Sequence, residues 1–153
     1  MINFWAPGQP QPKGSAKAWI VKPKFGKARA IVTNDNAKAK PWAAVVTLSA
    51  QQAMAGRAPI DGPVSVQLAF VLARPKAHYT TKGLRANAPA YVEKKPDIDK
   101  ITRTVLDAIT MAAVWGDDAQ VAALVVEKRY GEQPGVRVLV ERMAEQQLAM
   151  GVG

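Results

Sequence analysis

The clearest periodicity in the chain lies between residues 64 and 72. Every second position from Val64 to Leu72 carries a large apolar side chain, and the positions between them include Ser65 and Gln67. A two-residue period of this kind predicts a strand that buries one face. Shorter apolar runs bounded by Pro and Gly predict further strands at residues 2–6, 18–21, 29–33, 121–130 and 136–142.

Two segments have the spacing of helices. The first, 41–54, starts at Pro41, a residue favoured at the first helical position, and stops before Gly56. In the second, 99–113, polar Asp99, Arg103 and Asp107 share one side at i, i+4 and i+8. The opposite side carries an apolar stripe at a period near 3.6, made of Ile101, Val105, Ala108, Ile109 and Ala112.

The order of these elements predicts an α+β fold with a small mixed or antiparallel sheet packed with two main helices. A length of 153 residues favours a single domain, since domains commonly span about 100–200 residues. Residues 73–96 lack periodicity, and a loop of this length is usually functional or mobile. The Gln- and Ala-rich tail, 144–153, is expected to be a short helix or frayed.

Composition excludes several kinds of chemistry. The chain has no cysteine and one histidine, His78, which rules out disulfides and thiolate metal sites and argues against a Ser-His-Asp triad. No apolar run is long enough to span a membrane, and the first residues lack a signal-peptide pattern. We therefore expect a cytoplasmic protein with neither a membrane partner nor a nucleotide cofactor.

Charge is distributed unevenly along the chain. Residues 1–95 hold 15 Lys and Arg against three Asp and Glu, whereas residues 96–153 hold six against nine. A half this basic favours a polyanionic partner, with nucleic acid first. A basic balance that serves only solubility, or nonspecific binding, is the open alternative.

The candidate DNA contacts lie in two basic loops and at the start of the second helix. Tyr79 and Tyr91 are interleaved in the second loop and are suited to stacking on bases. The same loop is also compatible with a solvated, mobile lysine-rich segment. The predicted contacts are Lys13, Lys17, Lys22, Lys24, Lys27, Arg74, Lys76, Lys82, Arg85, Lys94, Lys95 and Lys100.

Acidic residues gather where the basic half ends, at Asp97, Asp99, Asp107, Asp117 and Asp118. Close carboxylates repel one another, so the cluster favours a bound cation. With no Cys and one His, that ion is expected to be one that prefers oxygen ligands, Mg²⁺ or Mn²⁺.

Each acid also has a plain structural interpretation. Asp99 is a suitable helix N-cap, and Asp97 a suitable partner for the helix dipole. Gly116 to Asp118 is an ordinary turn composition, and Arg103 with Asp107 has the spacing of an exposed ion pair.

Geometry raises a difficulty for a single site. In extended chain Asp97 and Asp99 point to the same side, and Ile98 points to the core. A helix of about 15 residues is about 22 Å long, which separates them from Asp118 at its other end. Either the helix is shorter or bent, or the site is assembled in another way.

The stretch 94–130, KKPDIDKITRTVLDAITMAAVWGDDAQVAALVVEKRY, resembles the RusA family of Holliday-junction resolvases, which is common in phages and prophages. The matching positions are Asp97 and Asp99, Arg103, Asp107 to Ile109, and Asp117 to Val121. Two positions depart from the family pattern. Lys100 replaces a frequent asparagine, and Arg103 replaces a lysine, which differs in geometry and proton chemistry.

The resemblance implies a homodimer that resolves Holliday junctions and other branched DNA by paired nicks in recombination and repair. It implies Mg²⁺, with Mn²⁺ as a possible substitute, and acids that converge on one site. By resemblance the catalytic residues are Asp97, Asp99, Asp118 and Arg103. The metal ligands are Asp97, Asp99 and Asp118, with Asp117 beside them. Two alternatives stay open: a noncatalytic basic DNA-binding protein with affinity for junctions, and a nuclease without structural preference.

Overall fold

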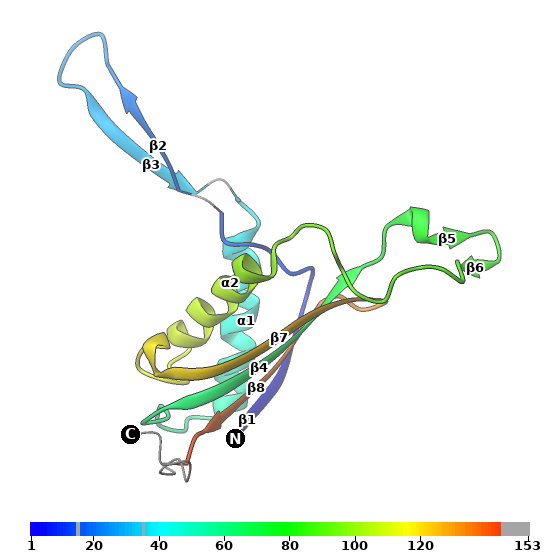
Figure 1. The fold of residues 1–153 in the computed structure, drawn as a ribbon. Coiled ribbons are helices and arrows are strands. Elements are labelled where there is room, and N and C mark those ends of the chain that lie inside the picture. The colour runs from blue at the N-terminus through cyan, green and yellow to red at the C-terminus, as the bar shows by residue number, and fades with distance from the viewer. Residues whose placement is uncertain (15, 35, 145–153) are drawn as a thin grey trace, which may run out of the picture.

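One mixed sheet forms the centre of the molecule (Figure 1). The computed structural model describes residues 1–14, 16–34 and 36–144. The strand order is β1 (Ile2–Pro7), β8 (Gly135–Arg142), β4 (Val64–Ala73) and β7 (Val121–Gly131). β8 runs antiparallel to both of its neighbours, whereas β4 and β7 are parallel. Parallel neighbours require a long crossover, and the chain between β4 and β7 provides one that includes the second helix.

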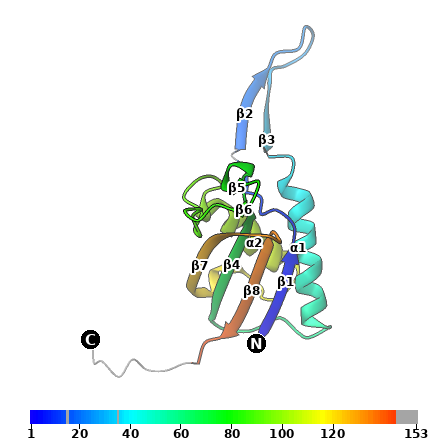
Figure 2. The same cartoon turned by 90° about the vertical axis from the view of Figure 1, so that its right-hand side faces the viewer.

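Helices α1 (Ala39–Met54) and α2 (Ile98–Met111) lie on the same face of this sheet (Figures 1 and 2). α1 packs against β1 and α2, and α2 lies beside β7. The alternating residues of β4 and the apolar stripe of α2 are all buried between these layers, as their periodicities predict. The expected α+β fold, with a mixed sheet and two helices, is therefore confirmed.

Both helices begin earlier than the sequence pattern suggests. α1 starts at Ala39, so Pro41 sits in its first turn, where backbone N–H groups have no partner within the helix and proline costs little. α2 starts at Ile98, and Asp97 rather than Asp99 is its N-cap residue. Within the described part of the chain, no helix has both the length and the apolarity to cross a membrane.

Two hairpins project from this body. β2 (Ala16–Val21) and β3 (Arg29–Asn34) form an antiparallel arm that extends well beyond the sheet (Figures 1 and 2). The second projection contains a short 3-10 turn, η1 (Lys76–His78), and the two-residue strands β5 (Tyr79–Thr80) and β6 (Gly83–Leu84). The expectation that residues 73–96 form no regular structure is therefore wrong. The tail prediction falls on residues 145–153, which lie outside the described residues.

Candidate active site

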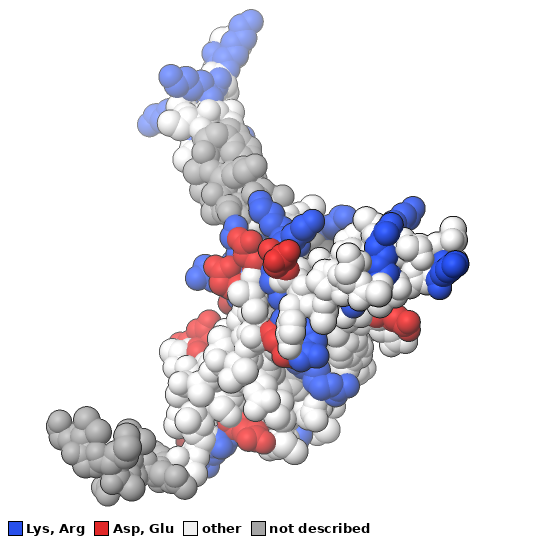
Figure 3. Space-filling model, turned by 45° about the vertical axis from the view of Figure 1, so that its right-hand side comes forward, with Lys and Arg blue, Asp and Glu red and all other residues white. Residues whose placement is uncertain are grey.

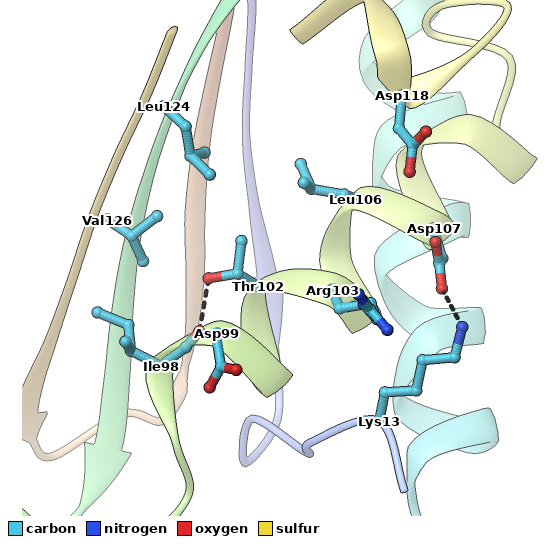
Figure 4. A pocket seen from close by; sticks show the side chains of 10 residues that line it. All are labelled: Lys13, Ile98, Asp99, Thr102, Arg103, Leu106, Asp107, Asp118, Leu124 and Val126. Atoms are coloured by element: carbon cyan, nitrogen blue, oxygen red, sulfur yellow. Dashed lines mark hydrogen bonds and ion pairs between the residues drawn. The ribbon is translucent and has the colours of Figure 1, made fainter. Parts of the chain in front are cut away.

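A groove of about 720 Å³ runs along the exposed side of α2, between this helix and β7 (Figure 4). Apolar side chains from both elements form one wall, and charged side chains form the other. The lining residues are Lys13, Ile98, Asp99, Thr102, Arg103, Leu106, Asp107, Asp118, Leu124 and Val126.

The helical period sets the charged wall. Asp99, Arg103 and Asp107 all line the groove, as their i, i+4 and i+8 spacing predicts. One turn of helix separates Arg103 from each of the two aspartates, so a cation stands between two carboxylates along the groove (Figure 4).

Asp118 reaches this groove from the other end of α2. It opens the 3-10 turn η2 (Asp118–Gln120), which Asp117 caps by accepting a hydrogen bond from the Ala119 amide at 2.9 Å. The Gln120 carboxamide fixes the turn. Its Oε1 accepts from the amides of Gly116 and Asp117 at 2.8 and 3.2 Å.

The same carboxamide also ties the turn to the loop before β4. Its Nε2 donates to the carbonyls of Ile60 and Gly62 at 2.9 and 2.8 Å. Asp118 is therefore held beside Asp107, with Asp99 at the opposite end of the groove (Figure 4). The length of α2 was expected to keep Asp99 and Asp118 in separate places. Both line one groove because the groove runs along the helix.

Asp97 lies apart from these acids. It lines a neighbouring pocket of about 430 Å³ with Lys13, Lys95 and Lys100, and the Lys100 Nζ is 3.7 Å from its Oδ2. The expectation that Asp97 and Asp99 point to the same side is wrong, because α2 begins at Ile98 and rotates Asp99 away. Ile98 is half-exposed in the groove rather than in the core.

The structural roles expected for these acids, which are helix capping, interaction with the helix dipole and an exposed ion pair, are only partly observed. Asp97 is the N-cap of α2, but its side chain makes no capping hydrogen bond. Asp99, in the first turn, is placed to interact favourably with the helix dipole. The expected ion-pair partner of Asp107 was Arg103, yet the Lys13 Nζ contacts its Oδ2 at 2.8 Å.

Neighbouring carboxylates shift each other's ionisation. A backbone hydrogen bond from Ala119, and then the side chain of Asp118, lower the pKa of Asp117. The shared hydrogen bond with Asp117 raises the pKa of Asp118, and the charges of Asp117 and Asp107 add to this, whereas Arg103 opposes it. Asp118 thus occupies a crowded negative position, which a cation would relieve.

The donor chemistry fits Mg²⁺ only in part. Among the residues that the structure describes, no three Asp, Glu or His side chains come close enough to hold one metal ion. Mg²⁺ usually keeps several waters and binds through one or two carboxylates plus substrate phosphates. Asp118, exposed beside Asp107, and Asp99, exposed at the other end of the groove, each present oxygen donors that suit that mode of binding.

The candidate DNA contacts divide into free and engaged side chains. Lys22, Lys24 and Lys27 are exposed on the arm, while the side chain of Lys17 lies outside the described part. Figure 3 shows Lys and Arg gathered on both projections, with Asp and Glu between them. Among the second loop's contacts, Lys76, Lys82, Lys94 and Lys95 are also exposed.

Two predicted contacts instead support the second projection itself. Arg74 donates to the Pro89 carbonyl at 2.7 Å, and Arg85 donates to the Ala77 carbonyl at 2.8 Å. Both guanidiniums retain further donors, but their positions are set by the loop.

Sequence reasoning missed Lys128 as a supporting residue. Its Nζ, on β7, donates to the carbonyls of Lys94 and Pro96 at 2.6 and 2.8 Å. These hydrogen bonds hold the segment that leads into Asp97. The sequence hints at this position only through the alternation of Lys128 with Val126 and Tyr130, which pack against the core. The Lys13–Asp107 pair, 94 residues apart, leaves no local signal.

An acid-lined groove between two basic projections defines a class of protein that acts on polyanions, with DNA foremost. Comparison with known proteins identifies the family. Residues 7–141 match the family model of the endodeoxyribonuclease RusA. The chain is also 30% identical over 146 residues to YqaN, an uncharacterised protein of Bacillus subtilis (strain 168), covering 94% of this chain and 97% of that protein. The chain belongs to the RusA endodeoxyribonuclease family, a family of DNA-cleaving enzymes.

Proposed function

We propose that this chain is a Mg²⁺-dependent endonuclease that resolves Holliday junctions and other branched DNA. The supporting observation is the groove along α2, which Asp99 and Asp118 both line although 19 positions separate them in the chain. Lys13 and Arg103 line the same groove, and Lys100 lies beside Asp97 in the adjoining pocket. These cations would offset the repulsion between the carboxylates and an approaching polyanion.

Each residue of the groove has a role in phosphodiester hydrolysis. A bound Mg²⁺ would supply charge neutralisation at the phosphate and a lowered pKa for a coordinated water. Asp99 and Asp118 would hold one or two ions from the two ends of the groove, with Asp97 contributing from the adjoining pocket and Asp117 orienting Asp118. Arg103 points along the groove between the acids and is placed to bind the scissile phosphate with its planar fork of donors.

The remaining parts would hold DNA. The lysines of the arm and of the second projection would bind the helical arms of a junction, with Lys94, Lys95 and Lys100 nearest the groove. A homodimer would present two such grooves, and two-fold symmetry would place paired nicks on strands of like polarity. We infer a cytoplasmic, DNA-associated enzyme of recombination and repair.

The deciding experiment compares a synthetic four-way junction with a linear duplex built from the same arms. Both substrates are incubated with the protein, with and without Mg²⁺. We expect paired symmetric nicks in the junction alone, and only with metal. Asp99→Asn should abolish them, whereas Glu132→Gln, an exposed acid in the β7–β8 turn, should cleave as the wild type does.

A noncatalytic DNA-binding protein is the rival, favoured by the absence of a three-acid metal group among the described residues. It predicts tight, salt-sensitive junction binding with no product in Mg²⁺ or Mn²⁺. Equal cleavage of junction and duplex would instead indicate a nuclease without structural preference.

A further inference from the structure

The tip of the β2–β3 arm carries a large aromatic side chain far from any core. The tip is defined here as residues 22–28, between the two strands of the arm. Phe25 lies in its middle and is 85% exposed, the most exposed of the large apolar side chains that the structure describes. At this exposure the ring contributes almost nothing to the packing of the protein and is available to bind a partner.

The surroundings of Phe25 indicate the chemistry of that partner. Lys22, Lys24 and Lys27 are all exposed around it, and residues 16–34 contain no acidic residue. Lysines around an exposed aromatic ring form the combination by which proteins bind nucleic acid with accessible base faces: phosphates meet the cations and a base stacks on the ring.

The local backbone keeps Phe25 at the end of the arm. Pro23 restricts the chain on one side of it, and Gly26 on the other side has φ of 106°, a conformation that favours glycine. The turn is therefore built by residues without functional side chains, while the residues between them display a ring and ammonium groups.

The base of the arm is tied to the candidate active site. The Asn36 side chain donates to the Pro12 carbonyl at 2.8 Å, which joins the two ends of the arm. Lys13 then fastens this base to α2, because its amide donates to the Lys100 carbonyl at 3.2 Å and its Nζ contacts Asp107. Strands of six residues place the tip about 20 Å beyond this base.

Regular duplex DNA gives a phenylalanine little to bind. A two-stranded ribbon fits the major groove, but the groove presents mostly polar base edges. The flat faces of bases are covered by their neighbours except where the stack is interrupted, as at a branch point. We propose that Phe25 stacks on a base that loses its neighbour at the branch point of junction DNA, while the lysines of the tip hold the flanking phosphates. This inference rests on the proposed function and adds a residue that distinguishes junction from duplex.

The test uses a four-way junction with 2-aminopurine at the branch point, without divalent metal so that no strand is cut. Its fluorescence rises when the base leaves the stack of its neighbours. We compare the wild type with Phe25→Ala, Phe25→Trp and a matched control, Ile20→Ala, which removes another exposed apolar side chain (67%) from the same arm.

Phe25→Ala is expected to weaken junction binding roughly 5- to 150-fold, the range for loss of one base–aromatic stack, without altering duplex binding. The fluorescence rise at the branch point should disappear with it. Phe25→Trp should retain both properties, and Ile20→Ala should match the wild type. Lys24→Ala should weaken the binding of junction and duplex alike.

Three results would overturn the stacking role. Phe25→Ala could bind the junction as the wild type does, lose junction and duplex binding equally, or change the oligomeric state and so reveal a protein contact. If the wild type cuts junctions in Mg²⁺ and any of these is seen, only this inference fails. If the wild type neither prefers nor cuts junctions, the proposed function fails as well.

Discussion

Gln120 is the residue through which the turn carrying Asp118 is attached to the rest of the fold, and its replacement offers the sharpest test of the site's architecture. Its carboxamide makes four hydrogen bonds, two as acceptor within the turn and two as donor to the carbonyls of Ile60 and Gly62. Two of these bonds thus fix the turn itself, and the other two join it to a segment about 60 positions earlier in the chain.

The expected loss follows from these bonds. An intramolecular hydrogen bond contributes about 0.5–1.5 kcal/mol net, so four would amount to roughly 2–6 kcal/mol. Because the side chain is partly exposed and water can replace some partners, we expect Gln120→Ala to lower the free energy of unfolding by about 2–4 kcal/mol. For a chain of this size that corresponds to a melting temperature lower by about 5–15 °C.

Urea unfolding, followed by tryptophan fluorescence and far-ultraviolet circular dichroism, measures the loss. Gln120→Glu has nearly the same shape but presents no donor to the two carbonyls at neutral pH, so we expect it to be at least as unstable as Gln120→Ala. Gln52→Ala, an exposed position of α1, is the matched control and should stay within about 0.5 kcal/mol of the wild type. A Gln120→Ala variant as stable as that control would refute the reasoning.

Three further predictions concern the groove and its supports. Asp118→Asn should abolish junction cleavage while junction binding stays equal or tightens, because one charge that repels phosphate is removed; a folded variant that loses both binding and cleavage in gel assays would contradict a catalytic role. Lys128→Met should lower the free energy of unfolding by about 1–2 kcal/mol, because two charged hydrogen bonds to partly exposed carbonyls are lost, and should slow cleavage by releasing the segment before Asp97; unchanged urea midpoint and rate would exclude this support. Asp117→Asn keeps an oxygen that can cap Ala119 but removes the carboxylate that raises the pKa of Asp118, so that pKa should fall and Asp118 should ionise at lower pH; carbon NMR titration of the Asp118 carboxyl measures the shift, and an unchanged pKa would exclude Asp117 as its cause.

Local periodicity predicted most of the elements and the exposed face of α2, because burial of one side of a helix or strand leaves its period in the sequence. The hairpin expected from residues 18–21 and 29–33 is present, but the pattern could not predict which strands pair within the central sheet. The parallel contact of β4 with β7 depends on how α2 packs, which no short window records. The 3-10 turn and hairpin within residues 76–84 are equally hidden, since two-residue strands have no period to detect.

Errors at the site have a similar origin. In a helix successive side chains are turned by about 100°, whereas in a strand they alternate by about 180°, so a helix that begins one residue earlier sends Asp97 and Asp99 into different pockets. α2 spans 14 residues, close to the expected length. Because the groove runs along this helix, Asp99 and Asp118 both line it although they lie at opposite ends. Lys13 shows the limit of local reasoning: it was expected to contact DNA, and its partner Asp107 lies 94 positions away.

The two departures from the family pattern acquire a physical meaning from their positions. Lys100 lies 3.7 Å from Asp97 in the smaller pocket, and Arg103 stands between Asp99 and Asp107 in the groove. Lys100 adds a positive charge next to Asp97, and Arg103 keeps one next to the acids of the groove, where the carboxylates alone would repel phosphate. A guanidinium stays charged at every relevant pH and offers a fixed fork of donors, whereas a lysine would offer a mobile point charge. A phosphodiester laid along α2 would thus meet alternating charges, and the role we propose for Arg103 is to bind it between the two acids on the helix.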